Sequence, residues 1–155
     1  MLSSVLRFVR LPFVLLAIWA VGRFTMGFFA EFSPRTNATF SVVVMTLITS
    51  LYFGALSKSV GGFDWKGTAL VGAAIGVFAQ LLIIFFTAVS LVAHLEESSF
   101  FLIREATGLE PDAPITWSTM VVARGTGIII NTILATLEAC VGRLLFAGFA
   151  PGSKA

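Results

Sequence analysis

Residues 67–92 read GTALVGAAIGVFAQLLIIFFTAVSLV and contain no charged side chain. A helix rises about 1.5 Å per residue, so about 20 apolar residues cross the hydrocarbon core of a bilayer, and this stretch is longer than that. Trp65 and Lys66 stand just before it, and aromatic and basic residues are typical of the membrane surface. The stretch therefore predicts a transmembrane helix over residues 67–93 that is long enough to tilt.

The composition of the whole chain agrees with a lipid environment. Its 155 residues are 57% hydrophobic and only 12% charged, and the mean hydropathy is +0.98. Soluble domains have about twice this share of charged residues. The net charge of +2 is scattered rather than gathered into a basic face, which does not fit nucleic-acid binding. We expect a single transmembrane domain over residues 1–155.

Three more apolar runs complete the predicted fold. They cover residues 11–30, 38–57 and 116–147. With the run at 67–93 they predict an all-α bundle of four transmembrane helices. The acidic third connection, residues 94–115, contains the apolar patch Phe100–Ile103, for which we expect a short helix at the membrane interface. A secretory signal would also begin with basic residues, but the length of the first run favours an uncleaved anchor.

The distribution of basic residues predicts the orientation. On one side of a four-span arrangement fall Arg7, Arg10, Lys58, Lys66, Arg143 and Lys154. The other side has Arg35, Arg104 and most of the acidic residues. Because short cytoplasmic segments retain Lys and Arg, both termini are expected in the cytoplasm. The high content of Phe, Ala and Gly and the short loops favour the inner membrane of a bacterium.

Each predicted span has one face of small and polar residues. On the third span this face is Gly72, Gly76, Gln80, Thr87 and Ser90, and on the last it is Arg124, Gly127, Asn131, Ala135, Glu138 and Gly142. The first span has Ala20, Arg23, Gly27 and Ala30, and the second has Thr46, Thr49, Ser50 and Phe53. Small residues let helices approach closely in lipid, so these faces are predicted to pack together.

A polar layer within the membrane is the candidate site. Counting 1.5 Å per residue places four side chains at about one depth in the outer half of the core, namely Arg23, Thr46, Gln80 and Arg124. A charge within a span costs at least about 2.5 kcal/mol. One interpretation is that both arginines extend to lipid phosphates or to the acidic loop. The other is a laterally open site for an anionic group of a lipid, a small acid or a partner subunit.

The last span also carries a polar stripe, which consists of Arg124, Asn131 and Glu138. Glu138 is expected near the inner surface, where a basic residue such as Arg10, Lys58 or Arg143 can pair with it. Arg7 is a fourth candidate for this ion pair.

Little in the sequence favours catalysis or cofactor binding. Cys140 is the only cysteine, which excludes an intrachain disulfide and disfavours a cysteine metal site. His94 is the only histidine and, although an axial haem or pigment ligand is conceivable, a polar residue at a helix end is the simpler interpretation. Asn37-Ala-Thr39 fits the glycosylation pattern but adjoins the membrane. We expect no enzyme, no cofactor and no bound metal.

Three classes of function are compatible with these patterns. The first is a non-catalytic polytopic membrane protein, a structural or accessory subunit that packs against lipids, other membrane subunits or itself. The alternative is a small homo-oligomeric transporter or channel that uses the outer polar layer together with Asn131. The third, an enzyme acting on lipids at the outer loop, has no supporting motif.

Overall fold

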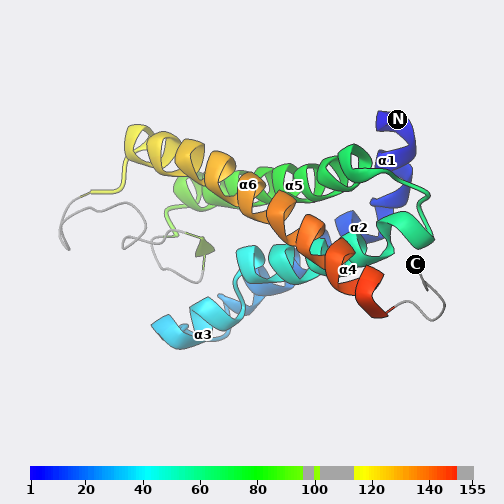
Figure 1. Ribbon diagram of the computed structural model, residues 1–155. Coiled ribbons are helices and arrows are strands. Elements are labelled where there is room, and N and C mark those ends of the chain that lie inside the picture. The colour runs from blue at the N-terminus through cyan, green and yellow to red at the C-terminus, as the bar shows by residue number, and fades with distance from the viewer. Residues whose placement is uncertain (96–99, 102–113, 150–155) are drawn as a thin grey trace.

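The computed structural model describes residues 1–95, 100–101 and 114–149. Every element assigned in this part is a helix, which confirms the all-α prediction. The six helices are α1 (Leu2–Phe8), α2 (Arg10–Met26), α3 (Pro34–Thr39), α4 (Val42–Ser59), α5 (Trp65–Val92) and α6 (Trp117–Phe149) (Figure 1). The start of α1, the α4–α5 turn and the end of α6 lie at one end of the bundle, which we call the α1 end. We call the opposite end the α3 end.

Three helical segments are long and apolar enough to cross a membrane. They are Arg35–Ser59, Trp65–Val92 and Trp117–Phe146. A fourth crossing is present only if α1 and α2, which are bent by 51° at the break between them, count as one span. The chain is therefore an α-helical protein with three to four segments suited to a membrane.

The first apolar run differs most from the prediction of one helix over 11–30. Helix α2 begins upstream at Arg10 and ends at Met26, and residues 27–29 form a turn. Pro12 is the third residue of α2 and lies in its first turn, directly after α1. A proline ring clashes with the carbonyl four residues earlier, which in this chain belongs to Phe8, the last residue of α1. The bend at Val9 follows from this clash.

Capping side chains set the starts of α3, α4 and α5. Ser33 Oγ accepts a hydrogen bond from Thr36 N, and Ser41 Oγ accepts one from Val43 N. In place of the single predicted span 38–57, these two caps give the short helix α3 and the longer α4. Asp64 Oδ1 accepts from Gly67 N at 2.8 Å and starts α5 at Trp65.

The third connection is described only in part. The expected interfacial helix, and most of the acidic stretch 94–115, lie outside the described residues. Phe100 and Phe101 are described and are buried, with 5% and 2% of their surface exposed. Helix α6 then begins at Trp117, one residue after the predicted start of the last span.

The predicted packing faces bring the long helices together. On the third span, Gly72, Gly76, Gln80, Thr87 and Ser90 are all buried, and so are Thr46, Thr49, Ser50 and Phe53 on the second. A Cβ on Gly72 would lie 2.5 Å from the carbonyl oxygen of Ala135, so no larger residue fits there. Helix α6 packs along α5 and crosses α4 (Figure 1). On the first span, Ala20 and Arg23 are buried, whereas Ala30 is exposed.

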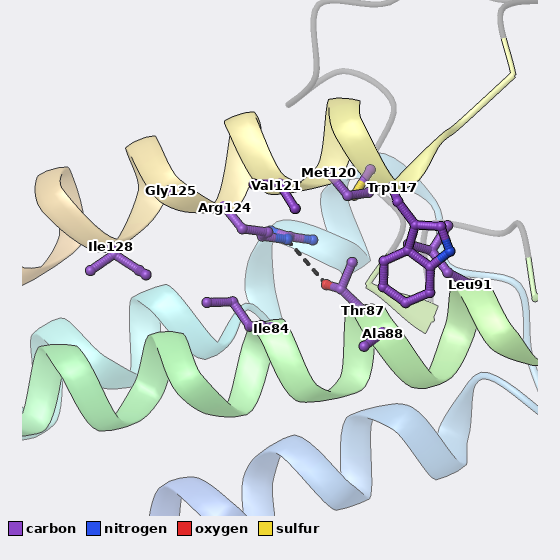
Figure 2. Close-up of a pocket in the computed structure, with 10 residues that line it drawn as sticks. All are labelled: Ile84, Thr87, Ala88, Leu91, Trp117, Met120, Val121, Arg124, Gly125 and Ile128. Atoms are coloured by element: carbon purple, nitrogen blue, oxygen red, sulfur yellow. Dashed lines mark hydrogen bonds between the residues drawn. The ribbon is translucent and has the colours of Figure 1, made fainter.

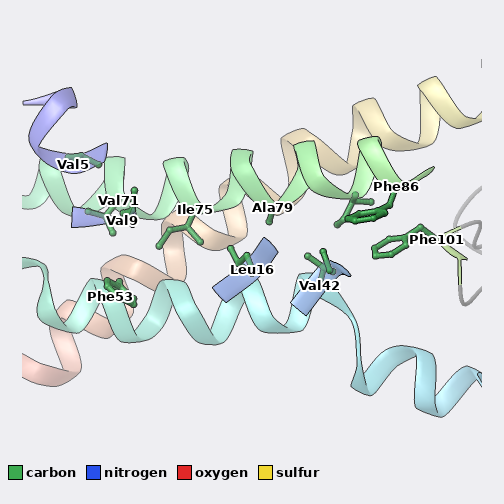
Figure 3. Close-up of a cluster of buried hydrophobic side chains, with 12 residues drawn as sticks. Val5, Val9, Leu16, Val42, Phe53, Val71, Ile75, Ala79, Phe86 and Phe101 are labelled. Atoms are coloured by element: carbon green, nitrogen blue, oxygen red, sulfur yellow. The ribbon is translucent and has the colours of Figure 1, made fainter. Parts of the chain in front are cut away.

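An apolar cluster fills the space between α2, α4 and α5. Leu16, Val42 and Ile75 are almost fully buried at its centre (Figure 3). Val5 and Val9 extend it to the α1 end, and Phe101 extends it to the α3 end. The cluster therefore runs from one end of the bundle to the other and includes Phe101 of the third connection.

Candidate functional site

Two arginines from different helices contact the same residue at the α3 end. The guanidinium carbon of Arg23, on α2, lies 4.5 Å from the centre of the Phe101 ring. Arg124 Nη2, on α6, donates to the backbone carbonyl of Phe101. The Phe101 ring in turn stacks on Phe86 of α5, with centroids 5.4 Å apart. One residue of the third connection thus links α2, α5 and α6.

Arg23 also binds a side chain for which the sequence suggested another role. Its Nη2 donates to Asn37 Oδ1 on α3, and both residues are buried, at 4% and 9% exposure. An amide oxygen is a neutral acceptor that satisfies a guanidinium without a second buried charge. The side chain of Asn37, the acceptor residue of the glycosylation pattern, thus makes a structural contact with Arg23. The connection between α2 and α3 is short, so the sequence could have indicated that Asn37 lies near Arg23.

Arg124 is held by two residues of its own bundle. Its Nε donates to Thr87 Oγ1 at 3.1 Å, and Thr87 Oγ1 donates to Ile83 O at 2.7 Å. Next to it, Ser90 Oγ contacts Phe86 O at 2.9 Å and also the carbonyl of Phe100. The polar residues of α5 and α6 therefore anchor residues 100–101 between the helices.

The other two members of the predicted layer contact residues other than Phe101. Thr46 Oγ1 donates to Val42 O within α4 at 2.6 Å. Gln80 faces α6, because its Oε1 lies 3.3 Å from the point where a Cβ on Gly127 would stand, and Asn131 Nδ2 lies 3.8 Å from that point. The two arginines thus meet at Phe101, whereas Gln80 lies with Asn131.

A groove opens beside Arg124 between α5 and α6 (Figure 2). It has a volume of about 240 Å³ and is lined by Ile84, Thr87, Ala88, Leu91, Trp117, Met120, Val121, Arg124, Gly125 and Ile128. The guanidinium of Arg124 points to Thr87 in the middle of the groove, and Trp117 and Leu91 lie at one end. An apolar cavity of about 150 Å³ already holds a benzene ring. The groove can therefore take an apolar body that carries one anionic group.

A second groove lies between α1, α2 and α5 and has a volume of about 400 Å³. Its lining is entirely apolar and includes Leu6, Phe13 and Phe78. It suits acyl chains and provides no group that would select among them.

At the α1 end, Arg143 forms a cluster that the sequence did not predict. Its Nη1 donates to Thr68 Oγ1 at 2.7 Å and to Phe63 O at 3.0 Å. Its guanidinium carbon lies 4.4 Å from the centre of the Trp65 ring. The sequence suggested Arg143 as a topological signal and as an ion-pair partner of Glu138, but its Nη1 is used to tie α6 to the α4–α5 turn. Arg143 stands next to Gly142, which is on the predicted packing face, so the sequence could have indicated that Arg143 lies between helices.

The remaining candidate residues lie apart from both arginine clusters. Asn131, Glu138 and Cys140 are half-buried on α6, and His94 is exposed at the end of α5. Within the described part of the chain, no three residues of the types His, Cys, Asp and Glu lie close enough together to hold a metal ion.

The described part of the chain has three to four helical segments that are long and apolar enough to cross a membrane, which is compatible with an integral α-helical membrane protein. Comparisons with protein-family models, with curated proteins and with solved structures find no match to this chain. Function is therefore argued from the helices and the grooves themselves.

Proposed function

We propose that this protein is a non-catalytic, four-span membrane protein that acts as a structural or accessory subunit and packs against helices of other membrane proteins and against lipids. The observation that carries the proposal is the exposure of α6. Only 22% of the most apolar stretch of α6 is buried, compared with 44% of the corresponding stretch of α5. Its outward side consists of large apolar residues, among them Val121, Val122, Ile129, Ile130, Ile133, Leu137 and Leu144.

The contacts of two buried arginines and one half-buried arginine support a structural role. Arg23 donates to Asn37, Arg124 donates to Thr87 and Phe101, and Arg143 donates to Thr68 and Phe63. Each of these contacts joins two different helices, or a helix and a connection, through a neutral acceptor. Such side chains stabilise the bundle and position its surface for neighbours.

A stoichiometric partner should remain with the protein after extraction in a mild detergent. Because α6 has the smallest buried share of the three long spans, replacing Ile129 and Ile133 by alanine should lower the recovery of this partner several-fold in native mass spectrometry. The matched control replaces Val44 and Ile48, which are exposed on α4, by alanine and should leave recovery unchanged. Recovery of the chain with lipid alone, or equal losses in both double variants, would overturn the proposal.

The four-span part of the proposal combines α1 and α2 into one broken span and places both termini in the cytoplasm of a bacterium. It is supported by the position of α1, the α4–α5 turn and the end of α6 at one end of the bundle (Figure 1). Arg7 lies in α1, Arg10 begins α2, and Lys58 and Lys66 flank the α4–α5 turn, so these basic residues gather at that end.

Alkaline phosphatase fusions test this orientation, because the enzyme is active only outside the cytoplasm. We expect a fusion after Phe32, between α2 and α3, to be active, and fusions after Gly62 and Lys154 to be inactive. Activity of the fusion after Lys154 would show that the orientation or the number of crossings is wrong.

A further inference from the structure

We infer that the groove between α5 and α6 binds a transmembrane helix of a partner protein, and that a carboxylate on this helix pairs with Arg124. The inference rests on the proposed accessory function and names the chemistry of the partner. Three features carry it: the guanidinium, the shape of the groove and the depth of both in the membrane.

The guanidinium of Arg124 is fixed and has donors to spare. Thr87 Oγ1 and the Phe101 carbonyl accept from its Nε and Nη2, which hold the plane of the group in the groove (Figure 2). An arginine has five N–H donors, and within the described part of the chain two of them are used by these acceptors. A planar fork in this state matches a carboxylate. Lipid solvates a cation poorly, so an anionic partner is favoured there.

The groove can receive side chains from one face of a helix that lies along it. A Cβ on Gly125 would meet no atom within 4 Å, so the surface beside Arg124 is open. Ala88 lines the opposite side of the groove on α5. Small residues permit the close backbone approach on which helix association in lipid depends. From Trp117 to Ile128 the groove follows α6 for roughly 16 Å, or three helical turns.

The depth of Arg124 favours a protein carboxylate over a lipid phosphate. From Trp117 to Arg124 the helix rises about 10 Å. Tryptophan is typical of the membrane interface, and lipid phosphates lie at or beyond that level. A phosphate would have to be drawn about 10 Å inward to reach the guanidinium, whereas a carboxylate on a helix can stand at any depth.

A second copy of this chain does not supply the carboxylate from its helices. Glu138 is the only acidic residue in the described helices, and it lies about 21 Å along α6 from Arg124. In a parallel copy, Glu138 would stand at the same wrong depth. Because the described helices offer no carboxylate at this depth, we assign it to a helix of a different protein, with an Asp or Glu about 10 Å below the outer end of its span.

A defined probe tests this inference without knowledge of the partner. The probe is a synthetic Leu–Ala transmembrane helix with one Asp at the depth of Arg124, compared with the same helix carrying Asn. Binding to the full chain in phosphatidylcholine proteoliposomes is measured by energy transfer from a fluorescent protein fused after Lys154. We expect the Asp helix to bind about tenfold more tightly than the Asn helix, and Arg124→Gln to abolish this preference.

Two further variants separate the groove from the charge. Gly125→Leu fills the groove and keeps Arg124, so it should weaken binding of the Asp helix several-fold. Gly22→Leu is the matched control, because Gly22 is also exposed, stands beside an arginine and has nothing within 4 Å of its Cβ position. It should bind as the natural chain does. Gly125 has open space, so its variant is expected to fold even if Arg124→Gln does not.

The possible outcomes decide between occupants. Equal binding of the Asp and Asn helices, or a preference that survives Arg124→Gln in folded protein, overturns the inference. Loss of the preference when phosphatidylglycerol is added would assign the groove to a lipid anion and also overturns it. If the natural partner co-purifies with Arg124→Gln as well as with the natural chain, the accessory function stands and the inference is wrong. If the Asp preference is found but no natural partner is, only the accessory function fails.

Discussion

Replacing Gly142 by leucine should prevent α6 from docking on α4 and should strongly destabilise the folded bundle. A Cβ on Gly142 would overlap the carbonyl oxygen of Leu51 and lie 2.9 Å from its carbon and 3.1 Å from Ala55 N. All three are backbone atoms, which cannot rotate away as a side chain can. The two helices would have to separate.

The same crossing has a second glycine on the opposite helix. A Cβ on Gly54 would overlap the carbonyl oxygen of Ala139 and would lie almost as close to the Cα of Ala139. Overpacking in a core that can adjust its side chains costs about 1–3 kcal/mol. Because backbone meets backbone from both sides of this crossing, we expect Gly142→Leu to cost at least about 3 kcal/mol, at the top of that range.

Alanine variants provide the control for this prediction. Gly142→Ala should already lower the midpoint of unfolding. This midpoint is measured in a mild detergent, with unfolding induced by heating or by titration with dodecyl sulfate. Gly125→Ala adds the same methyl group in open space and, because alanine is the better helix former by about 1 kcal/mol, should be neutral or stabilising. Similar unfolding midpoints for the two variants would show that the helices are not in contact at Gly142.

The packing faces were predictable because they depend on helical periodicity alone. Gly72 and Gly76 stand one turn apart, so any helix over residues 67–93 puts them on one face, and both are buried against α6. The close crossing of Gly54 and Gly142 was not predictable as a pair. It depends on the angle between α4 and α6, which no single-helix pattern contains.

The polar layer shows the same limit. Counting residues gives the depth of a side chain but not its direction around the bundle. Arg23 and Arg124 were placed at one level, and both contact Phe101. Gln80 was placed at that level too, but it faces Gly127 of α6 rather than Phe101. Phe101 itself could not be foreseen as the common contact, because its position depends on the fold of the third connection.

The bend between α1 and α2 could have been anticipated. The apolar pattern continues upstream of Leu11 through Val5 and Val9, both fully buried. A helix extended to Leu2 puts Pro12 in its interior, where a proline breaks or kinks a helix. Because the predicted span began at Leu11, Pro12 fell in its first turn and no break was predicted.

Replacing Arg143 by methionine should destabilise the α1 end by about 3 kcal/mol. Hydrogen bonds to a charged group contribute about 1.5–3 kcal/mol, and stacking on an aromatic ring contributes about 0.5–2 kcal/mol. The two contributions are not additive. The change removes the bonds to Thr68 Oγ1 and Phe63 O and the contact with Trp65. Thr68 Oγ1 keeps Ser57 Oγ at 2.7 Å, whereas the Phe63 carbonyl loses its donor. Dodecyl sulfate titration measures the difference.

The comparison with lysine separates a structural arginine from a topological one. Lysine retains the positive charge that orients a span but has neither the planar fork nor the flat face for Trp65. If Arg143 ties α6 to the α4–α5 turn, Arg143→Lys should recover less than half of the lost stability, and Arg10→Met, at an exposed position, should change it by no more than about 0.5 kcal/mol. Full recovery by lysine would reduce Arg143 to an orientation signal. A double-mutant cycle with Trp65→Leu then isolates the ring contact, because a coupling energy of at least about 0.5 kcal/mol is expected only if the two side chains interact.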